Sequence, residues 1–145
     1  MIKLTELDLM PTTALYPFDG EAIDHAALEA FIKVTIGQNK KSIIIFGANW
    51  CPDALHLEAV MQLPTISKFI QANFEVMRVD LGKYDLNMTA IELFGIPSTE
   101  GIPRVFILDL LGNPMNRDSN DKWRSARDSN AQEIFNYFQY FSTLN

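Results

Sequence analysis

SIIIFGANWCPD, residues 42–53, joins an apolar run to the single cysteine of the chain, Cys51. Residues 42–46 are mostly β-branched or aromatic, which is typical of a central strand buried on both faces. Most of residues 54–61, which follow, have good helix propensity. The sequence therefore predicts that Cys51 lies where a strand turns into a helix.

Two further strands are predicted downstream of this unit. Apolar and polar residues alternate over 74–80, and Pro64 breaks or kinks the helical stretch that separates the two strands. A strand, helix, strand unit of this length implies parallel pairing with a right-handed crossover. Residues 104–109 predict a third strand, and turn residues at 111–113 predict a hairpin with a return strand.

Helical patterns lie on either side of the strands. We expect Asp24 to cap a helix, because apolar residues recur at helical spacing between 27 and 36. We expect Asn87 to cap a short helix that ends near Phe94. A last helix, over 130–141, carries aromatic residues dense enough to anchor it on the sheet. The polar stretch 118–129 predicts a loop or a frayed edge.

The first twenty residues contain two prolines and a glycine and show no long periodic pattern. They predict an extended N-terminal arm, residues 1–20, with a short strand around 14–16. No repeat and no linker follows. We therefore expect one α/β domain over residues 1–145.

Composition and charge exclude some classes of function. Of the 145 residues 48% are hydrophobic and 21% charged, and the net charge of −6 argues against binding to nucleic acid. No run approaches the about 20 apolar residues that cross a bilayer, so we expect no membrane span. The first ten residues do not read as a signal peptide. This favours a cytoplasmic location, with the periplasm as the alternative if a signal peptide has been removed.

Cys51 is the candidate nucleophile. In the first turn of a helix, unpaired N–H groups and the positive end of the helix dipole favour thiolate over thiol. Pro52 suits this position, because its missing N–H would have no intrahelical partner there. Asp53 opposes the effect, since a carboxylate near a thiolate disfavours a second negative charge. We therefore expect a moderately activated sulfur, exposed at the tip of the helix.

The motif Trp-Cys-Pro-Asp at 50–53, placed after an apolar strand and followed by Ile102-Pro103 before another, resembles the thioredoxin superfamily. The resemblance extends from Ser42 to the C-terminal helix and implies a thioredoxin fold, a central mixed β-sheet flanked by helices, here with an N-terminal extension. It implies a cis peptide bond at Pro103 facing the cysteine, with the backbone of Ile102 pairing with a substrate. An ordinary trans proline at the start of a strand is the alternative.

The same resemblance assigns roles to other residues. Trp50 and Pro103 would shape the groove that binds the substrate, and Pro52, Asp53 and Ile102 would line it. Glu58 falls where related reductase domains keep an acid that helps proton transfer. A solvated glutamate on the helix surface is the alternative interpretation of Glu58.

Two positions depart from the family pattern. Ala54 stands where the family has its second cysteine, and Ile45 stands where many members keep a buried acid. Without a resolving thiol, Cys51 can form a mixed disulfide but cannot release the substrate by a second attack from its own chain. The arrangement is that of a natural one-thiol protein, or of a Cys-Pro-Asp-Cys site in which one cysteine has been changed to alanine.

The predicted function is thiol-disulfide exchange on a protein thiol or disulfide at a redox-active Cys51. A non-catalytic binding module of the same fold, with Cys51 as a small buried residue, is the alternative. A glutathione-dependent enzyme would need a glutathione site, which no sequence feature indicates. His25 and His56 show no zinc-like spacing, so we expect neither metal nor cofactor. We expect a monomer.

Overall fold

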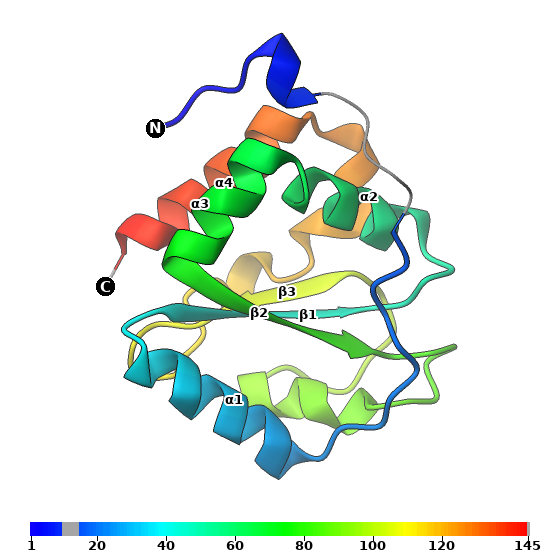
Figure 1. The fold of residues 1–145 in the computed structure, drawn as a ribbon. Coiled ribbons are helices and arrows are strands. Elements are labelled where there is room, and N and C mark those ends of the chain that lie inside the picture. The colour runs from blue at the N-terminus through cyan, green and yellow to red at the C-terminus, as the bar shows by residue number, and fades with distance from the viewer. Residues whose placement is uncertain (10–14, 145) are drawn as a thin grey trace.

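A three-stranded sheet forms the centre of the protein, in a computed structural model that describes residues 1–9 and 15–144 (Figure 1). The strand order is β2-β1-β3. The central strand β1 (Lys41–Gly47) pairs in parallel with β2 (Phe74–Asp80) and antiparallel with β3 (Arg104–Ile107). Every residue of β1 is buried, as expected for a strand covered on both faces.

Helices cover both faces of the sheet (Figure 1). One face carries α1 (His25–Gly37) and the 3₁₀ helix η2 (Met88–Phe94). The other face carries α2 (Pro52–Met61), α3 (Pro64–Asn73), the 3₁₀ helix η4 (Lys122–Asp128) and α4 (Ala131–Thr143). Two short 3₁₀ helices, η1 (Glu6–Leu9) and η3 (Arg117–Ser119), complete the described elements.

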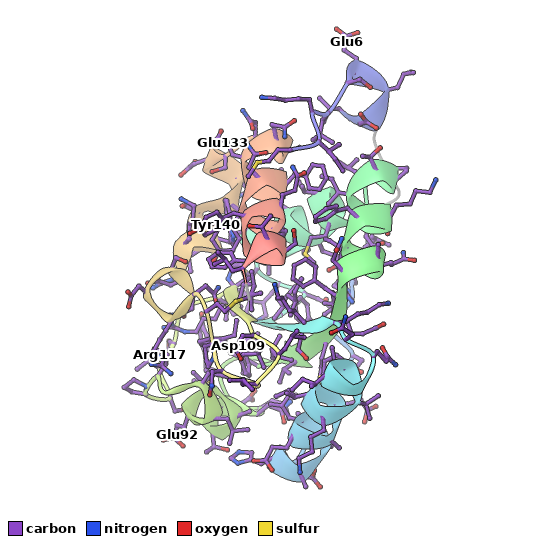
Figure 2. All side chains as sticks on the ribbon, turned by 90° about the vertical axis from the view of Figure 1, so that its left-hand side faces the viewer. Glu6, Glu92, Asp109, Arg117, Glu133 and Tyr140 are labelled. Atoms are coloured by element: carbon purple, nitrogen blue, oxygen red, sulfur yellow. The ribbon has the colours of Figure 1, made fainter. Side chains whose placement is uncertain are left out.

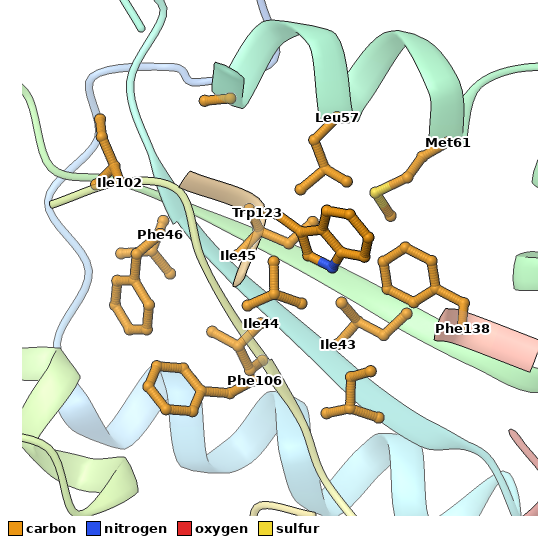
Figure 3. Packing of buried hydrophobic residues seen from close by; sticks show 14 of the residues in the cluster. Ile43, Ile44, Ile45, Phe46, Leu57, Met61, Ile102, Phe106, Trp123 and Phe138 are labelled. Carbon is orange, nitrogen blue, oxygen red and sulfur yellow. The ribbon is translucent and has the colours of Figure 1, made fainter. Parts of the chain in front are cut away.

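Alternate residues of β1 build two separate halves of the core, because successive side chains of a strand point to opposite faces. On the α2 side, Leu57 and Met61 point down from the helix toward Trp123 and Phe138, which lie over the isoleucines of β1 (Figure 3). The contacts of Leu57 and Met61 hold α2 against the sheet. On the opposite face, the rings of Phe46 and Phe106 meet edge-on with their centres 5.9 Å apart.

The strands and long helices confirm most of the sequence predictions. The second strand coincides with residues 74–80, and Pro64 occupies the first turn of α3. The Asp24 carboxylate accepts a hydrogen bond from the N–H of Ala27 at 2.7 Å, so Asp24 caps α1 as predicted. Asn130 and Glu133 form a reciprocal capping box that starts α4.

The aromatic residues of α4 divide between core and surface. Phe135 and Phe138 are fully buried, whereas Tyr140 is 51% exposed and lies on the outer side of the helix (Figure 2). Glu133 marks the exposed start of the same helix in that view. This division agrees with the prediction that one face of the helix anchors it on the sheet.

The predicted return strand after β3 is wrong. After β3, only a single bridge between Leu108 and Pro114 continues the pairing. The side chain of Asn116 takes over instead: its Oδ1 accepts from the N–H of Ile107 at 2.8 Å and its Nδ2 donates to the carbonyl of Val105 at 2.7 Å. Because these backbone groups are satisfied by a side chain, a fourth strand is not required there.

The prediction of a loop or frayed edge over 118–129 is also wrong. This stretch contains the end of η3 and all of η4, and it buries Trp123 to 1% exposure and Ala126 completely. The two residues are three apart, which places them on one face of a 3₁₀ helix. A pattern of only two apolar residues was too short to detect among so many polar ones.

Asn87 does not cap η2 in the predicted way. Its backbone is left-handed, with φ of 55°, and its side chain makes no capping bond. The side chain instead accepts from the N–H of Ile23 at 2.9 Å and donates to the carbonyls of Glu21 and Asp80. Asn87 therefore ties the N-terminal arm to the end of β2.

The N-terminal arm is less extended than predicted, since it contains η1. Of the strand expected around 14–16, residue 14 lies outside the described residues, and 15–16 form no strand. Farther on, the side chain of Asn49 accepts from the N–H of Phe18 and donates to its carbonyl, at 3.1 and 2.6 Å. The arm thus crosses the carboxyl end of β1, beside the start of α2 (Figure 1).

Within the described part of the chain, no helix is long and apolar enough to cross a membrane.

Candidate active site

Cys51 lies at the junction of β1 and α2, as the sequence predicts. It is the N-cap residue of α2, with extended backbone angles (φ −90°, ψ 113°), and Pro52 occupies the first turn. The N–H of Cys51 donates to the carbonyl of Ala48 at 3.1 Å, and its carbonyl accepts from the N–H of Leu55 at 3.1 Å. These two bonds fix the backbone of the cysteine on both sides of the turn.

The expectation of an exposed sulfur is wrong, because Cys51 is only 6% exposed. Its Sγ donates a hydrogen bond to the carbonyl oxygen of Ile102 at 3.8 Å. Ile102, itself 6% exposed, belongs to the loop before β3, and this loop lies directly against the start of α2. The sulfur is therefore covered by the segment that the sequence analysis assigned to substrate binding.

The Ile102–Pro103 peptide bond is cis, and both residues are buried. The structure thus brings Cys51 together with Ile102 and Pro103, which lie about a third of the chain farther along the sequence. Pro52, in contrast, is exposed on the first turn of α2.

Trp50 is connected to the same loop through Tyr84. The indole is 50% exposed, donates from Nε1 to the carbonyl of Gly82 at 2.7 Å, and meets the ring of Tyr84 edge-on at 5.7 Å between centroids. The Tyr84 hydroxyl accepts from the N–H of Gly101 at 3.2 Å. Sequence reasoning missed Tyr84, since its backbone is left-handed (φ 64°) and no local pattern marks it as part of the site.

Asp53 points away from the sulfur toward η4. Its Oδ1 accepts from the N–H of Arg127 at 3.0 Å and pairs with the guanidinium Nε at 3.1 Å. Burial acts to raise the pKa of Asp53, but the two hydrogen bonds and the charge of Arg127 outweigh it, so the pKa lies below its ordinary value. The predicted opposition between Asp53 and a thiolate is thereby weakened, because Arg127 neutralises the carboxylate.

Ala54 and Glu58 occupy the buried side of α2. Ala54 is 2% and Glu58 4% exposed, so the interpretation of Glu58 as a solvated helix residue is wrong. The carboxylate pairs with Nε of Arg78 at 2.7 Å and accepts from Nε2 of Gln62 at 2.9 Å. Both of its oxygens are therefore engaged. Arg78 was missed because its partner lies twenty residues away on another element.

Ile45, one of the two positions that depart from the expected pattern, is fully enclosed in β1 at 2% exposure. It lies opposite Arg78 in the register of β1 and β2. The charges nearest to Ile45 on this side of the sheet are those of the half-buried Arg78 and the buried Glu58, and position 45 contributes only apolar packing.

No group of three or more histidine, cysteine, aspartate or glutamate side chains that could hold a metal occurs in the described ranges 1–9 and 15–144. In these ranges the Nε2 atom of His25 lies 3.2 Å from the hydroxyl oxygen of Thr89.

Comparison with solved structures identifies the fold. The chain superposes on a disulphide isomerase from Xylella fastidiosa Temecula1 with a TM-score of 0.79 and 25% sequence identity, covering 88% of this chain and 98% of that one. A protein of unknown function from Pseudomonas aeruginosa matches with a TM-score of 0.40 and 14% identity, over 79% of each chain. No family model and no curated protein matches the sequence. The protein therefore has a thioredoxin-like fold, as the sequence predicts.

Proposed function

We propose that this chain performs thiol-disulfide exchange on protein substrates through Cys51. The observation that carries the proposal is the position of the sulfur: it lies at the N-cap of α2, 3.8 Å from the carbonyl oxygen of Ile102. The structural similarity to a disulphide isomerase supports a redox role of this general kind.

The first step is an attack by the Cys51 thiolate on one sulfur of a substrate disulfide. A bond forms between Sγ and that sulfur, the substrate S–S bond breaks, and the other sulfur leaves as a thiolate with the electron pair. The proton that Cys51 loses beforehand passes to solvent. The product is a mixed disulfide between Cys51 and the substrate, together with one free substrate thiol.

The second step needs a thiol from outside the chain. Ala54 has no sulfur, so a small-molecule or protein thiolate must attack the mixed disulfide and release Cys51 as a thiolate. A cysteine at position 54 would instead attack Sγ of Cys51, so that the substrate sulfur leaves as a thiolate and a disulfide forms between positions 51 and 54. Residues three apart on a helix lie about 5–6 Å from each other, within the span of a disulfide.

The other site residues orient the substrate in this proposal. The backbone of Ile102 pairs with an extended segment of the substrate, while Trp50 and Pro103 form walls of the groove, and Pro52 and Asp53 its rim. Cys51 is only 6% exposed, so the substrate disulfide has to approach the sulfur closely along the segment that contains Ile102. Glu58, which lies one helical turn beyond position 54, assists the transfer of the Cys51 proton to solvent in this proposal.

The direct test is adduct formation. The reduced protein is mixed with an oxidised model protein, and the adduct is located by mass spectrometry after acid quenching, with Cys51→Ser as the matched control. We expect an adduct at Cys51 in the original chain and none in the variant. If no adduct forms over a wide pH range, the proposal is refuted.

Two further measurements separate exchange from simple binding. Ala54→Cys should raise disulfide reductase turnover sharply in the presence of an external reductant, since the substrate is then released internally. The alternative, a non-catalytic binding module, predicts no such gain. It also predicts that iodoacetamide alkylates Cys51 of the native protein slowly, as expected for a buried thiol, whereas a reactive thiol at the site would be alkylated fast.

A further inference from the structure

Three basic side chains project from η4, next to the proposed site, and two of them have evident partners. Arg127 pairs with Asp53 at 3.1 Å, and the Lys122 ammonium lies 5.3 Å from the centre of the Trp123 ring. Arg124 is exposed and forms no ion pair or side-chain hydrogen bond with any residue of the described ranges. Arg124 is therefore the cation of η4 that is available to a ligand.

The guanidinium of Arg124 lies against the loop that covers Cys51. A Cβ atom added to Gly101 would come within 2.6 Å of its Cζ, so the guanidinium rests directly on the backbone of Gly101. The next residue is Ile102, whose carbonyl contacts the sulfur. Arg124 thus stands at one end of the proposed substrate groove.

A second arginine adds positive charge behind this loop. Arg104 is only 7% exposed, and it donates to Oδ1 of Asn120 at 2.8 Å and to Oγ1 of Thr99 at 3.0 Å. Its Nε has no hydrogen-bond partner, and no carboxylate of the described residues pairs with it. The Nη2 atom of Arg104 also donates to the carbonyl of Glu100 at 3.3 Å, directly before Gly101, on which Arg124 rests. Burial and the charge of Arg124 lower the pKa of Arg104, whereas Asp121 and Tyr84 act to raise it.

Two neighbouring guanidinium groups without a carboxylate partner repel each other, and an anion between them or beside them relieves the repulsion. Carboxylates are the natural partner, because they accept two parallel hydrogen bonds from one guanidinium. Neither Glu100 nor Asp121 forms an ion pair with either arginine, and the charge of Asp121 acts on Arg104 only without direct contact.

We propose that Arg124, backed by Arg104, binds a carboxylate of the substrate, so that the chain prefers acidic peptide segments next to the reacting cysteine. The inference rests on the proposed exchange at Cys51, because it assumes that the substrate docks beside Ile102. An extended peptide advances about 3.3 Å per residue, so the acidic side chain would stand about two or three residues from the substrate cysteine.

The expected preference for acidic peptides comes from charges beside the site, whereas the net charge of the whole protein acts against it. With a net charge of −6 the protein repels an acidic peptide at long range. At about 0.15 M ionic strength the Debye length falls to about 8 Å, so that distant charges are screened while Arg124 still acts on a group in contact with it. The test therefore belongs at this ionic strength.

The experiment uses two peptides that differ in one residue, glutamate or glutamine, two positions from the cysteine. Covalent preference is the ratio of the rates at which their oxidised forms give an adduct with Cys51. Non-covalent preference is the ratio of dissociation constants of the corresponding serine peptides, followed by the anisotropy of a neutral fluorophore. We expect the glutamate peptide to be favoured about 5- to 10-fold in both measurements.

The variant Arg124→Gln should abolish the preference, and Lys122→Gln is the matched control. It removes the same charge from the same exposed element but leaves Arg124 in place, so the preference should remain. Equal behaviour of the two peptides with the original chain would refute the acidic-substrate inference and leave exchange intact. Binding preference without any adduct would refute the proposed exchange instead and leave the carboxylate site standing.

A small thiol compound is another possible source of the carboxylate, and glutathione disulfide tests it. Its reaction with Cys51 is measured in the original chain and in Arg124→Gln. If Arg124 accelerates this reaction while the two peptides behave alike, the site serves a small thiol, and the proposal of an acidic peptide is wrong.

Discussion

The buried pair of Glu58 and Arg78 allows a sharp test of what holds α2 against the sheet. The side chains are 5% and 23% exposed, and their charged atoms lie 2.7 Å apart. Removing the cation leaves a carboxylate in the core with only Gln62 to donate to it. Losing one partner of a buried pair costs about 3–5 kcal/mol. We expect about 3 kcal/mol for Arg78→Met, since Arg78 is not fully enclosed and Gln62 remains.

The reverse change should cost less. In Glu58→Met the guanidinium can turn toward water, and we expect a loss of about 1 kcal/mol. The double variant replaces the whole pair by apolar side chains of similar length, which is often close to neutral. We expect it to be within about 1 kcal/mol of the original chain, so that the two single effects fail to add by about 3 kcal/mol.

Urea denaturation measures these free energies, followed by tryptophan fluorescence, because Trp123 is 1% exposed and reports on the core. A loss below about 1 kcal/mol for Arg78→Met, or single effects that simply add, would refute the reasoning that the two charges of this pair are coupled. Adduct formation by the double variant then separates the two roles of Glu58. A normal rate would show that its part is structural, and a lower rate in a stable protein would support proton transfer.

Three further substitutions test individual contacts. Asp53→Asn should lower the free energy of unfolding by about 0.5 kcal/mol near neutral pH, a small value because Arg127 is exposed. Since the pKa of Asp53 is lowered in the folded state, this contribution is present above about pH 4 and is lost as the pH falls through the folded-state pKa. The unfolding curves of the variant and the original chain should therefore converge in acid. Asn116→Ala should cost about 2–3 kcal/mol in urea denaturation, since it leaves two buried backbone groups of β3 unpaired; a loss under about 1 kcal/mol would contradict this account. Gly47→Ala places a Cβ 2.4 Å from the ring of the arm's Phe18 and should lower the melting temperature by several degrees, whereas Gly37→Ala, which meets no atom within 4 Å, should not; equal effects would argue against the packing of the arm.

Local patterns in the sequence determine much of the fold. The β-branched run 42–46 specifies a strand that only a buried central position accommodates, and the helical spacing of apolar residues after Asp24 and Asn130 specifies α1 and α4 with their caps. The motif at 50–53 places the cysteine at a strand-to-helix turn without any knowledge of its neighbours. These features depend on residues close in sequence, so periodicity and propensity are enough to find them.

What the tertiary structure decided depends on residues far apart in sequence. Whether the sulfur of Cys51 is exposed is settled by Ile102, which lies 51 residues away in the sequence and covers it. Arg78 pairs with Glu58, and the side chain of Asn116 bonds to the backbone of β3 where a fourth strand would pair. No local pattern in the sequence predicts either contact. Burial and pairing of polar groups are properties of the packed assembly of elements, because each side chain's partner is fixed only when the sheet and its helices have come together.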